Sequence, residues 1–296
     1  MRANALGLCL LLTLGTAIGA AAQETPAASP QSAPKANQPD RNQTYCSGFV
    51  TDQKVADDVR LISGEESRVR LTFSDRNYVY INRGLNQGVR EGDRFTVVRP
   101  EKDAEEVVWF KWQSKLLKAM GTTYSDLGEV RVVKVQPSVS IAEITFSCNY
   151  MQRGDIVRPF AERPAAEFKP EAPFDHFAPL SGKPVAMVVE AKDFAQLVGR
   201  NDTVYVNLGT SQGVKPGDYF RIFRYQGTRA ETVATEKDFQ YMVFGFGSTP
   251  QRYQWNDLPR EILGEGIVLN ASHNSSTVLI TVSSADIYTG DYVELE

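Results

Sequence analysis

Short apolar runs with a period of two residues recur along most of the chain. They occupy residues 69–73, 79–81, 128–135 and 139–146 in the first half, and residues 185–190 and 204–206 in the second. Such alternation is typical of strands that bury one face of a sheet. The pattern therefore predicts a mainly all-β fold.

Residues 104–120 interrupt this strand pattern. Apolar side chains there fall on two stripes, one with Val108 and Trp112 and the other with Leu116 and Met120. Acidic residues at the start and lysines near the end suit the dipole of a helix. We therefore expect one amphipathic helix, inserted into the first β region and ended at Gly121.

A 17-residue stretch occurs twice in the chain. The stretch from Val79 to Phe95 matches the stretch from Val204 to Phe220 at ten of 17 positions, at a constant offset of 125. Further on, residues 127–129 match 263–265, and residues 154–157 match 290–293, both at an offset of 136. Two constant offsets on either side of one insertion indicate an internal repeat.

Glycines and aspartates carry the repeated motif. Glycine adopts positive φ at little cost, and aspartate after glycine bonds local backbone N–H groups, so both are typical of sharp turns before strands. The candidate turn residues are Gly84, Gly88, Gly92, Asp93, Gly154, Asp155, Gly209, Gly213, Gly217, Asp218, Gly290 and Asp291. A small sheet that curls into a barrel needs such corners. We expect two tandem small β-barrel modules, with the inserted helix in the first.

The module boundaries follow from composition. We expect module 1 over residues 46–162 with its helical insert at 104–120, and module 2 over residues 184–296 with an aromatic insert at 225–260. A proline-rich linker at 163–183 joins them. Residues 23–45 are rich in Pro, Ala, Ser and Asn and lack apolar periodicity, which predicts a disordered tether.

The start of the chain has the features of a signal peptide at residues 1–22. Arg2 precedes an apolar run over residues 5–15, and Ala20 to Ala22 form a small-residue cleavage site. An uncleaved anchor is the alternative. We expect an exported protein, periplasmic or secreted, with no membrane span after signal removal. The net charge of −4, without a basic stripe, argues against nucleic acid as a partner.

Two cysteines, Cys46 and Cys148, lie beyond the signal segment and near the ends of module 1. An even count in an oxidising compartment favours a disulfide. It would close a loop of roughly 100 residues and contribute up to about 4–5 kcal/mol in the chain-entropy model. Two separately buried thiols are the alternative.

The motif from Val79 to Phe95, followed by residues 127–130 and 154–157, resembles the C-terminal domain of the flagellar assembly protein T family. The tandem arrangement resembles exported hypothetical proteins of acidobacteria. The resemblance covers roughly residues 46–160 and 184–296. It implies a periplasmic, non-enzymatic β module, which in the flagellar case is part of a ring around the motor. This chain differs in having two modules instead of one.

Catalytic and metal-binding patterns are weak in this sequence. His176 and His273 have no partner at metal-ligand spacing, and no G-x-S-x-G nucleophile elbow occurs. We therefore expect no catalytic residue, no metal and no cofactor.

Aromatic residues gather in the two inserts, where the candidate binding residues are Trp109, Phe110, Trp112, Phe244, Phe246, Tyr253 and Trp255. Exposed aromatics on loops bind proteins or sugar faces. The alternative is that each insert folds back and caps its own barrel. The sequence favours a non-catalytic structural or adaptor protein of the cell envelope with an envelope protein partner. The second hypothesis is a module that binds peptidoglycan or another glycan, and the third is an enzyme.

Overall fold

The fold of the chain is mainly β, as the period-two pattern predicted. In a computed structural model, residues 37–101, 108–170, 173, 175–226 and 258–296 are described. Residues 37–296 belong to one compact unit that contains both modules. Among the described residues, no helix has the length and apolar character needed to span a bilayer.

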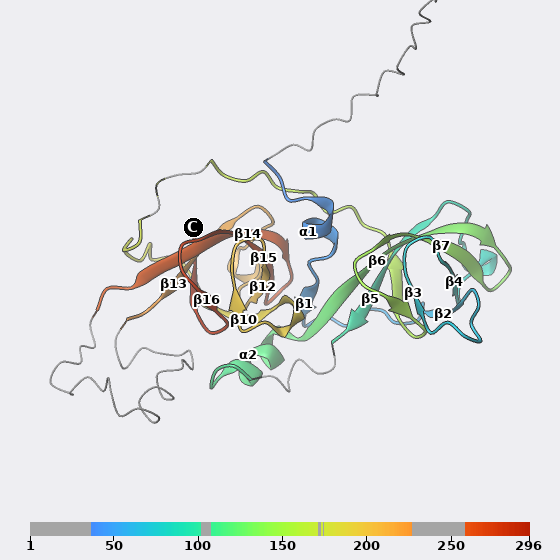
Figure 1. The fold of residues 1–296 in the computed structure, drawn as a ribbon, viewed down its shortest axis with the longest axis horizontal. Coiled ribbons are helices and arrows are strands. Elements are labelled where there is room, and N and C mark those ends of the chain that lie inside the picture. Colours follow the sequence, from blue (N-terminus) through green and yellow to red (C-terminus); the bar gives the residue numbers. More distant parts are fainter. Residues whose placement is uncertain (1–36, 102–107, 171–172, 174, 227–257) are drawn as a thin grey trace, which may run out of the picture. The chain divides into compact units, whose positions relative to one another are not determined.

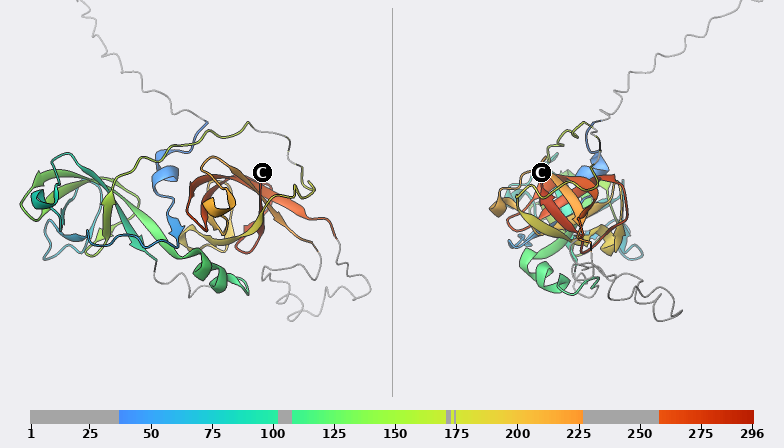
Figure 2. Two further views of the ribbon diagram at one scale, coloured as in Figure 1. Left: turned by 180° about the vertical axis from the view of Figure 1, so that it is seen from behind. Right: turned by 90° about the vertical axis from the view of Figure 1, so that its left-hand side faces the viewer.

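Module 2 is a closed barrel (Figures 1 and 2). Its antiparallel strands pair in the order β10 (Val185–Ala191), β12 (Thr203–Val206), β15 (Ser276–Ser283), β14 (Glu261–Ala271), β13 (Tyr219–Arg224) and β17 (Tyr292–Leu295). Strand β17 returns to β10, where Val185 faces Glu294. Alternate side chains point inward and form a core that includes Val188, Val204, Phe220, Ile222, Val278 and Ile280.

Module 1 repeats this order in a half-barrel. Its strands pair as β2 (Leu61–Gly64), β4 (Tyr78–Ile81), β7 (Ser140–Ser147), β6 (Thr122–Val135), β5 (Arg94–Pro100) and β9 (Ile156–Pro159). The two ends of the sheet meet at a single bridge between Arg60 and Ile156, where module 2 has a strand ladder. The core is again aliphatic and aromatic, with Leu61, Phe73, Val79, Val97, Val130 and Ile144.

Two-residue strands and short helical turns also recur in both modules. In module 1, β3 (Thr72–Phe73) pairs with β8 (Met151–Gln152), and in module 2, β11 (Leu197–Val198) pairs with β16 (Ile287–Tyr288). The repeated motif forms a single 3-10 turn, η1 (Leu85–Gln87) in one copy and η3 (Thr210–Gln212) in the other. A third such turn, η2 (Lys192–Phe194), follows β10. The modules therefore share local structure as well as strand order.

The glycines that flank η1 and η3 explain much of the repeat. Gly88 and Gly213 end these turns in the left-handed region, with φ of 84° and 86°. A Cβ atom at Gly84 would lie 2.2 Å from the Gln136 carbonyl oxygen, and one at Gly209 would lie 2.3 Å from that of Ser272. The repeated glycines are thus required by backbone geometry.

The disordered tether predicted for residues 23–45 is wrong at its C-terminal end. Helix α1 (Arg41–Tyr45) forms there, and a capping box between Asp40 and Gln43 starts it. Thr44 is buried, and the Tyr45 ring stacks on Phe160 with the centroids 5.6 Å apart. These contacts supply the apolar burial that composition alone did not indicate. Residues 23–36 lie outside the described residues.

The inserted helix is shorter than predicted. Helix α2 (Gln113–Met120) covers the second half of residues 104–120, whereas 108–112 form turns and 104–107 lie outside the described residues. The Gln113 side chain accepts the backbone N–H of Trp109, which holds the preceding residues in a non-helical turn. The helix begins only after this turn, at Gln113.

The predicted linker at 163–183 is irregular, but parts of it pack closely. The Phe168 N–H donates to the Asn37 carbonyl, and the Ile262 N–H donates to the His176 carbonyl beside β14. Ala178 is buried in a small cluster with Phe223 and Ile262. The linker therefore covers part of module 2. Most of the predicted aromatic insert at 225–260 lies outside the described residues.

Candidate functional site

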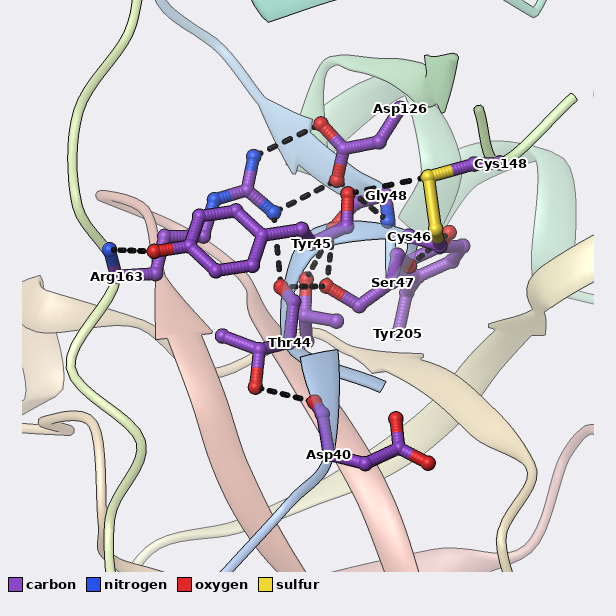
Figure 3. A network of polar contacts seen from close by, with 11 residues as sticks. Asp40, Thr44, Tyr45, Cys46, Ser47, Gly48, Asp126, Cys148, Arg163 and Tyr205 are labelled. Carbon is purple, nitrogen blue, oxygen red and sulfur yellow. Dashed lines mark hydrogen bonds and ion pairs between the residues drawn. A yellow bond between two sulfur atoms is a disulfide. The ribbon is translucent and has the colours of Figure 1, made fainter. Parts of the chain in front are cut away.

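Residues 44–52, here called the junction segment, contact both modules. Within this segment β1 (Phe49–Thr51) pairs with the start of β6 in module 1. Module 2 donates to its carbonyls: the Ser275 hydroxyl lies 2.6 Å from the Val50 oxygen, and the Tyr205 hydroxyl lies 2.9 Å from the Ser47 oxygen. One short segment therefore holds the modules together (Figure 3).

The predicted disulfide is confirmed. Cys46 in the junction segment is bonded to Cys148, which directly follows β7 of module 1. The same region holds a buried ion pair, in which the Arg163 guanidinium donates to both oxygens of Asp126 at 2.7 and 2.8 Å (Figure 3). Asp126 also accepts the Gly48 N–H at 3.0 Å. The disulfide and the hydrogen bond from Gly48 to Asp126 thus fix the junction segment to module 1.

Gly48 lies close against Tyr205 of module 2. Its φ is 67°, and a Cβ atom there would lie 2.4 Å from the Tyr205 hydroxyl oxygen. A side chain at this position would therefore displace Tyr205 and strain the backbone. Periodicity and motif spacing gave no signal for this role.

Helix α2 of module 1 packs on module 2. Leu117 and Met120 are buried in a cluster with Val189 and Tyr205, and the Gln113 amide donates to the Val189 carbonyl at 2.9 Å. The helix lies beside β10 in Figure 1. For the first insert, the idea that it caps its own barrel is wrong, because its apolar face covers the other module.

A carboxyl group is buried where the two modules meet. Glu190 at the end of β10 is 3% exposed, and its oxygen accepts the Thr123 hydroxyl of module 1 at 2.7 Å. Burial raises the pKa of Glu190 to about 7; the bond from Thr123 opposes this rise, and the charge of Glu101 adds to it. The charge of this buried group therefore changes near neutral pH.

The four motif aspartates form two groups in the structure. Asp93 and Asp218 accept the backbone N–H three residues earlier, that of Arg90 at 2.9 Å and that of Lys215 at 2.8 Å. Asp155 also accepts a local N–H, from Gln152 at 2.6 Å, but is buried. Asp93 and Asp218 thus act within turns, whereas Asp155 has a second role that it shares with Asp291.

Asp155 and Asp291 are buried, and each binds a partly buried arginine through both oxygens. Arg99 donates to Asp155 at 2.8 and 2.9 Å, and Arg224 donates to Asp291 at 2.7 and 2.6 Å. Burial lowers the pKa of the Arg224 guanidinium, but Asp291 outweighs it and the net pKa is raised. Sequence analysis missed these pairs, although Arg99 and Arg224 also lie at the repeat offset of 125.

The candidate aromatic residues are not equivalent. Phe110 is 3% exposed and lies against Gly290 of module 2, so its prediction as an exposed binding residue is wrong. Trp109 is half-buried, whereas Trp112 is 55% exposed. The remaining candidates lie outside the described residues: Phe244, Phe246, Tyr253 and Trp255. Among the described candidates, Trp112 is the one open to solvent.

A cleft of about 830 Å³ borders the junction segment. It is lined by the junction segment and the residues after it, by β9 and the start of the linker, and by residues 269–273 of module 2. Its volume is in the range of small-ligand sites. The wall contains the cations Lys54 and Arg158, both exposed.

Equivalent positions in the two modules differ at this cleft. In module 2, Glu294 of β17 is buried. One of its carboxylate oxygens lies 2.9 Å from the Arg260 guanidinium, and the other accepts the Ser181 hydroxyl at 2.7 Å. Burial favours the neutral acid, but these bonds outweigh it and the pKa of Glu294 is lowered. At the repeat offset of 136, module 1 has Arg158 in place of Glu294 and Tyr124 in place of Arg260. The charge on the strand is therefore reversed at the cleft.

The described residues contain no group of three or more His, Cys, Asp or Glu side chains arranged to hold a metal ion. His273 lies at the cleft, with Nδ1 3.2 Å from an Asp52 oxygen. The cleft can therefore supply charge and hydrogen bonds to a ligand. No protein-family model and no curated protein matches this chain.

Proposed function

We propose that this chain is an exported, non-catalytic structural or adaptor protein of the cell envelope, built from two repeated β modules. The observation that carries this proposal is the junction segment, which bonds to both modules and is held by the Cys46–Cys148 disulfide. A structural or adaptor protein holds its partners in fixed positions, so it benefits from modules that are fixed to one another. A disulfide is also compatible with an oxidising compartment, periplasmic or extracellular.

The buried charged groups support a non-catalytic role. Asp126, Asp155 and Asp291 each bind a guanidinium through both oxygens, so their lone pairs are used for structure. Bidentate pairs of this kind orient elements firmly. The proposal also retains the resemblance to the C-terminal domain of the flagellar assembly protein T family, in which the module is a periplasmic assembly part.

Crosslinking in the native host tests the adaptor role. The tagged chain is expressed at its natural level, crosslinked in the envelope fraction and purified under denaturing conditions. We expect a discrete set of crosslinked envelope proteins. The double variant Cys46→Ser, Cys148→Ser serves as the matched comparison and should weaken that set. Recovery of the chain alone and monomeric, in repeated preparations, would contradict the proposal.

A second candidate function is binding of peptidoglycan or another glycan, favoured by the exposed Trp112. Exposed indole rings stack on sugar faces, and the Lys111 ammonium lies 5.3 Å from the Trp112 ring centroid. Sedimentation with purified cell wall tests this function. Trp112→Ala should abolish pelleting, whereas Phe177→Ala, which removes another exposed aromatic from the linker, should not. Equal pelleting of all three proteins, or none, would argue against it.

A further inference from the structure

The cleft lies where the first barrel is open. In module 2, strand β10 pairs with β17 through Val185 and Glu294 and closes the barrel. In module 1, the closing contacts end at the Arg60–Ile156 bridge and the bond from the Val157 N–H to the Val59 carbonyl, and β9 continues to Pro159 with β5 as its partner on one side. On its other side, Arg158 and Pro159 border the cleft. This part of β9 has no second strand partner among the described residues.

Two positive charges beside this edge of β9 also lack ion-pair partners among the described residues. Arg158 lies over the Phe49 ring, 5.5 Å from its centroid, and Lys54 lines the same cleft. Neither cation forms an ion pair with a carboxylate of the described residues, whereas the Arg260–Glu294 pair fills the equivalent place in module 2. The whole chain has a net charge of −4, so binding of an anion here would reflect these local cations.

The other charged groups of the cleft are mostly paired. Arg83 binds Asp58 at 3.1 Å, and Arg163 binds Asp126. His273 contacts Asp52. Glu162 is the one acidic residue of the lining without an ion pair among the described residues. Among the charged side chains that line the cleft, two cations, Arg158 and Lys54, and one carboxylate, Glu162, therefore have no ion pair among the described residues.

We propose that this cleft binds an extended acidic peptide segment of a partner protein. A carboxylate of the peptide pairs with Arg158 and thereby completes the ion pair that module 2 makes internally. The peptide lies in the cleft beside the edge of β9, where Pro159 has no N–H to donate, so the contacts are made by side chains and not by strand pairing. Recognition of an acidic segment by arginine side chains is an established mode of peptide recognition. The choice of a peptide rests on the proposed adaptor role.

Fluorescence anisotropy with a labelled peptide of alternating Glu and Val tests the site. A peptide of alternating Lys and Val is the control of opposite charge. We expect saturable binding of one acidic peptide per chain, weakened by salt, and no binding of the basic peptide. No saturable binding of the acidic peptide, or equal binding of both, would overturn the proposal.

Variants locate the binding within the chain. Arg158→Gln should weaken binding about tenfold, as expected for loss of one charge-assisted bond. Glu162→Gln should strengthen binding, because it removes the free carboxylate in the cleft. Arg200→Gln makes the same change at an exposed arginine outside the cleft lining and should have no effect. Equal weakening by both arginine variants would show diffuse attraction and would overturn the assignment.

Two controls separate this inference from the proposed function. Unchanged circular dichroism and melting of Arg158→Gln would show that lost binding is local, and Arg158→Lys should retain part of the affinity. If crosslinking finds envelope partners while the acidic peptide does not bind, the adaptor role stands and the cleft assignment is wrong. If the peptide binds but crosslinking finds no partner in the envelope, the cleft assignment stands and the adaptor role is wrong.

Discussion

Replacing Glu190 by glutamine should make the folded protein more stable at neutral and higher pH. The carboxyl is buried between the modules, and burial raises its pKa from the ordinary 4.5 to about 7. Glutamine has nearly the same shape, accepts the same Thr123 hydroxyl and does not ionise. The variant therefore removes a titration and retains the packing.

The sign and size of the effect follow from the pKa. Because the folded pKa lies above the unfolded one, the folded protein holds its proton longer, and stability falls as pH rises from about 4.5 to about 7. Each pH unit in that window corresponds to about 1.4 kcal/mol, so the loss reaches about 3 kcal/mol above pH 7. Glu190→Gln should match the wild type near pH 4 and exceed it by up to that amount at pH 8.

Guanidinium unfolding followed by circular dichroism measures the difference at a series of pH values. Glu91→Gln, which removes an exposed carboxyl in the motif turn, is the matched control and should keep the pH dependence of the wild type. A stability difference between Glu190→Gln and wild type that is the same at pH 4 and pH 8 would refute this reasoning. So would a variant that is less stable than the wild type at pH 8.

Two further predictions concern the fixed points of the fold. The double variant Cys46→Ser, Cys148→Ser should lose about 2–4 kcal/mol of unfolding free energy, because it frees a long loop in the unfolded chain; denaturant titrations with and without reductant check this, and a reductant-insensitive wild type would contradict it. Asp291→Asn should lower stability by about 2–3 kcal/mol, because Arg224 keeps a largely buried charge without its counter-ion. Thermal melts should show a smaller loss for Asp218→Asn, whose carboxylate only accepts a turn N–H, and equal losses would argue against the distinction.

The repeat was sufficient to predict two similar β modules, although not their strand order. Gly84 and Gly209 lie where another backbone segment comes close, and Gly88 and Gly213 have left-handed backbone conformations. The spacing of these glycines in the sequence therefore indicates local three-dimensional structure. Period-two alternation located most of the strands, but of residues 69–73 only Thr72–Phe73 form one, and Val69 and Leu71 are exposed. The fold class therefore follows from local rules that each module obeys independently.

The relation between the modules could not be predicted in this way. The stripes of α2 show that one face is apolar, but they do not say which module this face covers, and Leu117 and Met120 pack on module 2. The ordered start at residues 40–45 did have a signal, since Asp40 and Gln43 have capping-box spacing. The reversed charge of Arg158 and Glu294 could have been found by aligning the two repeat copies beyond the shared motif.

The junction segment has a consequence for the order of folding. Its carbonyl at Val50 is bonded to Ser275, 225 residues later in the chain, and Gly48 is bonded to Thr277, 229 residues later. Contacts of such high sequence separation form slowly, since a long loop must close first. During synthesis, the last hydrogen-bond partners of the segment are therefore made only after almost the whole chain. Tyr205 of β12 bonds to Ser47 without needing β15, but the bonds from Ser275 and Thr277 form only once this last part of the chain has been made, so the junction between the modules is completed late.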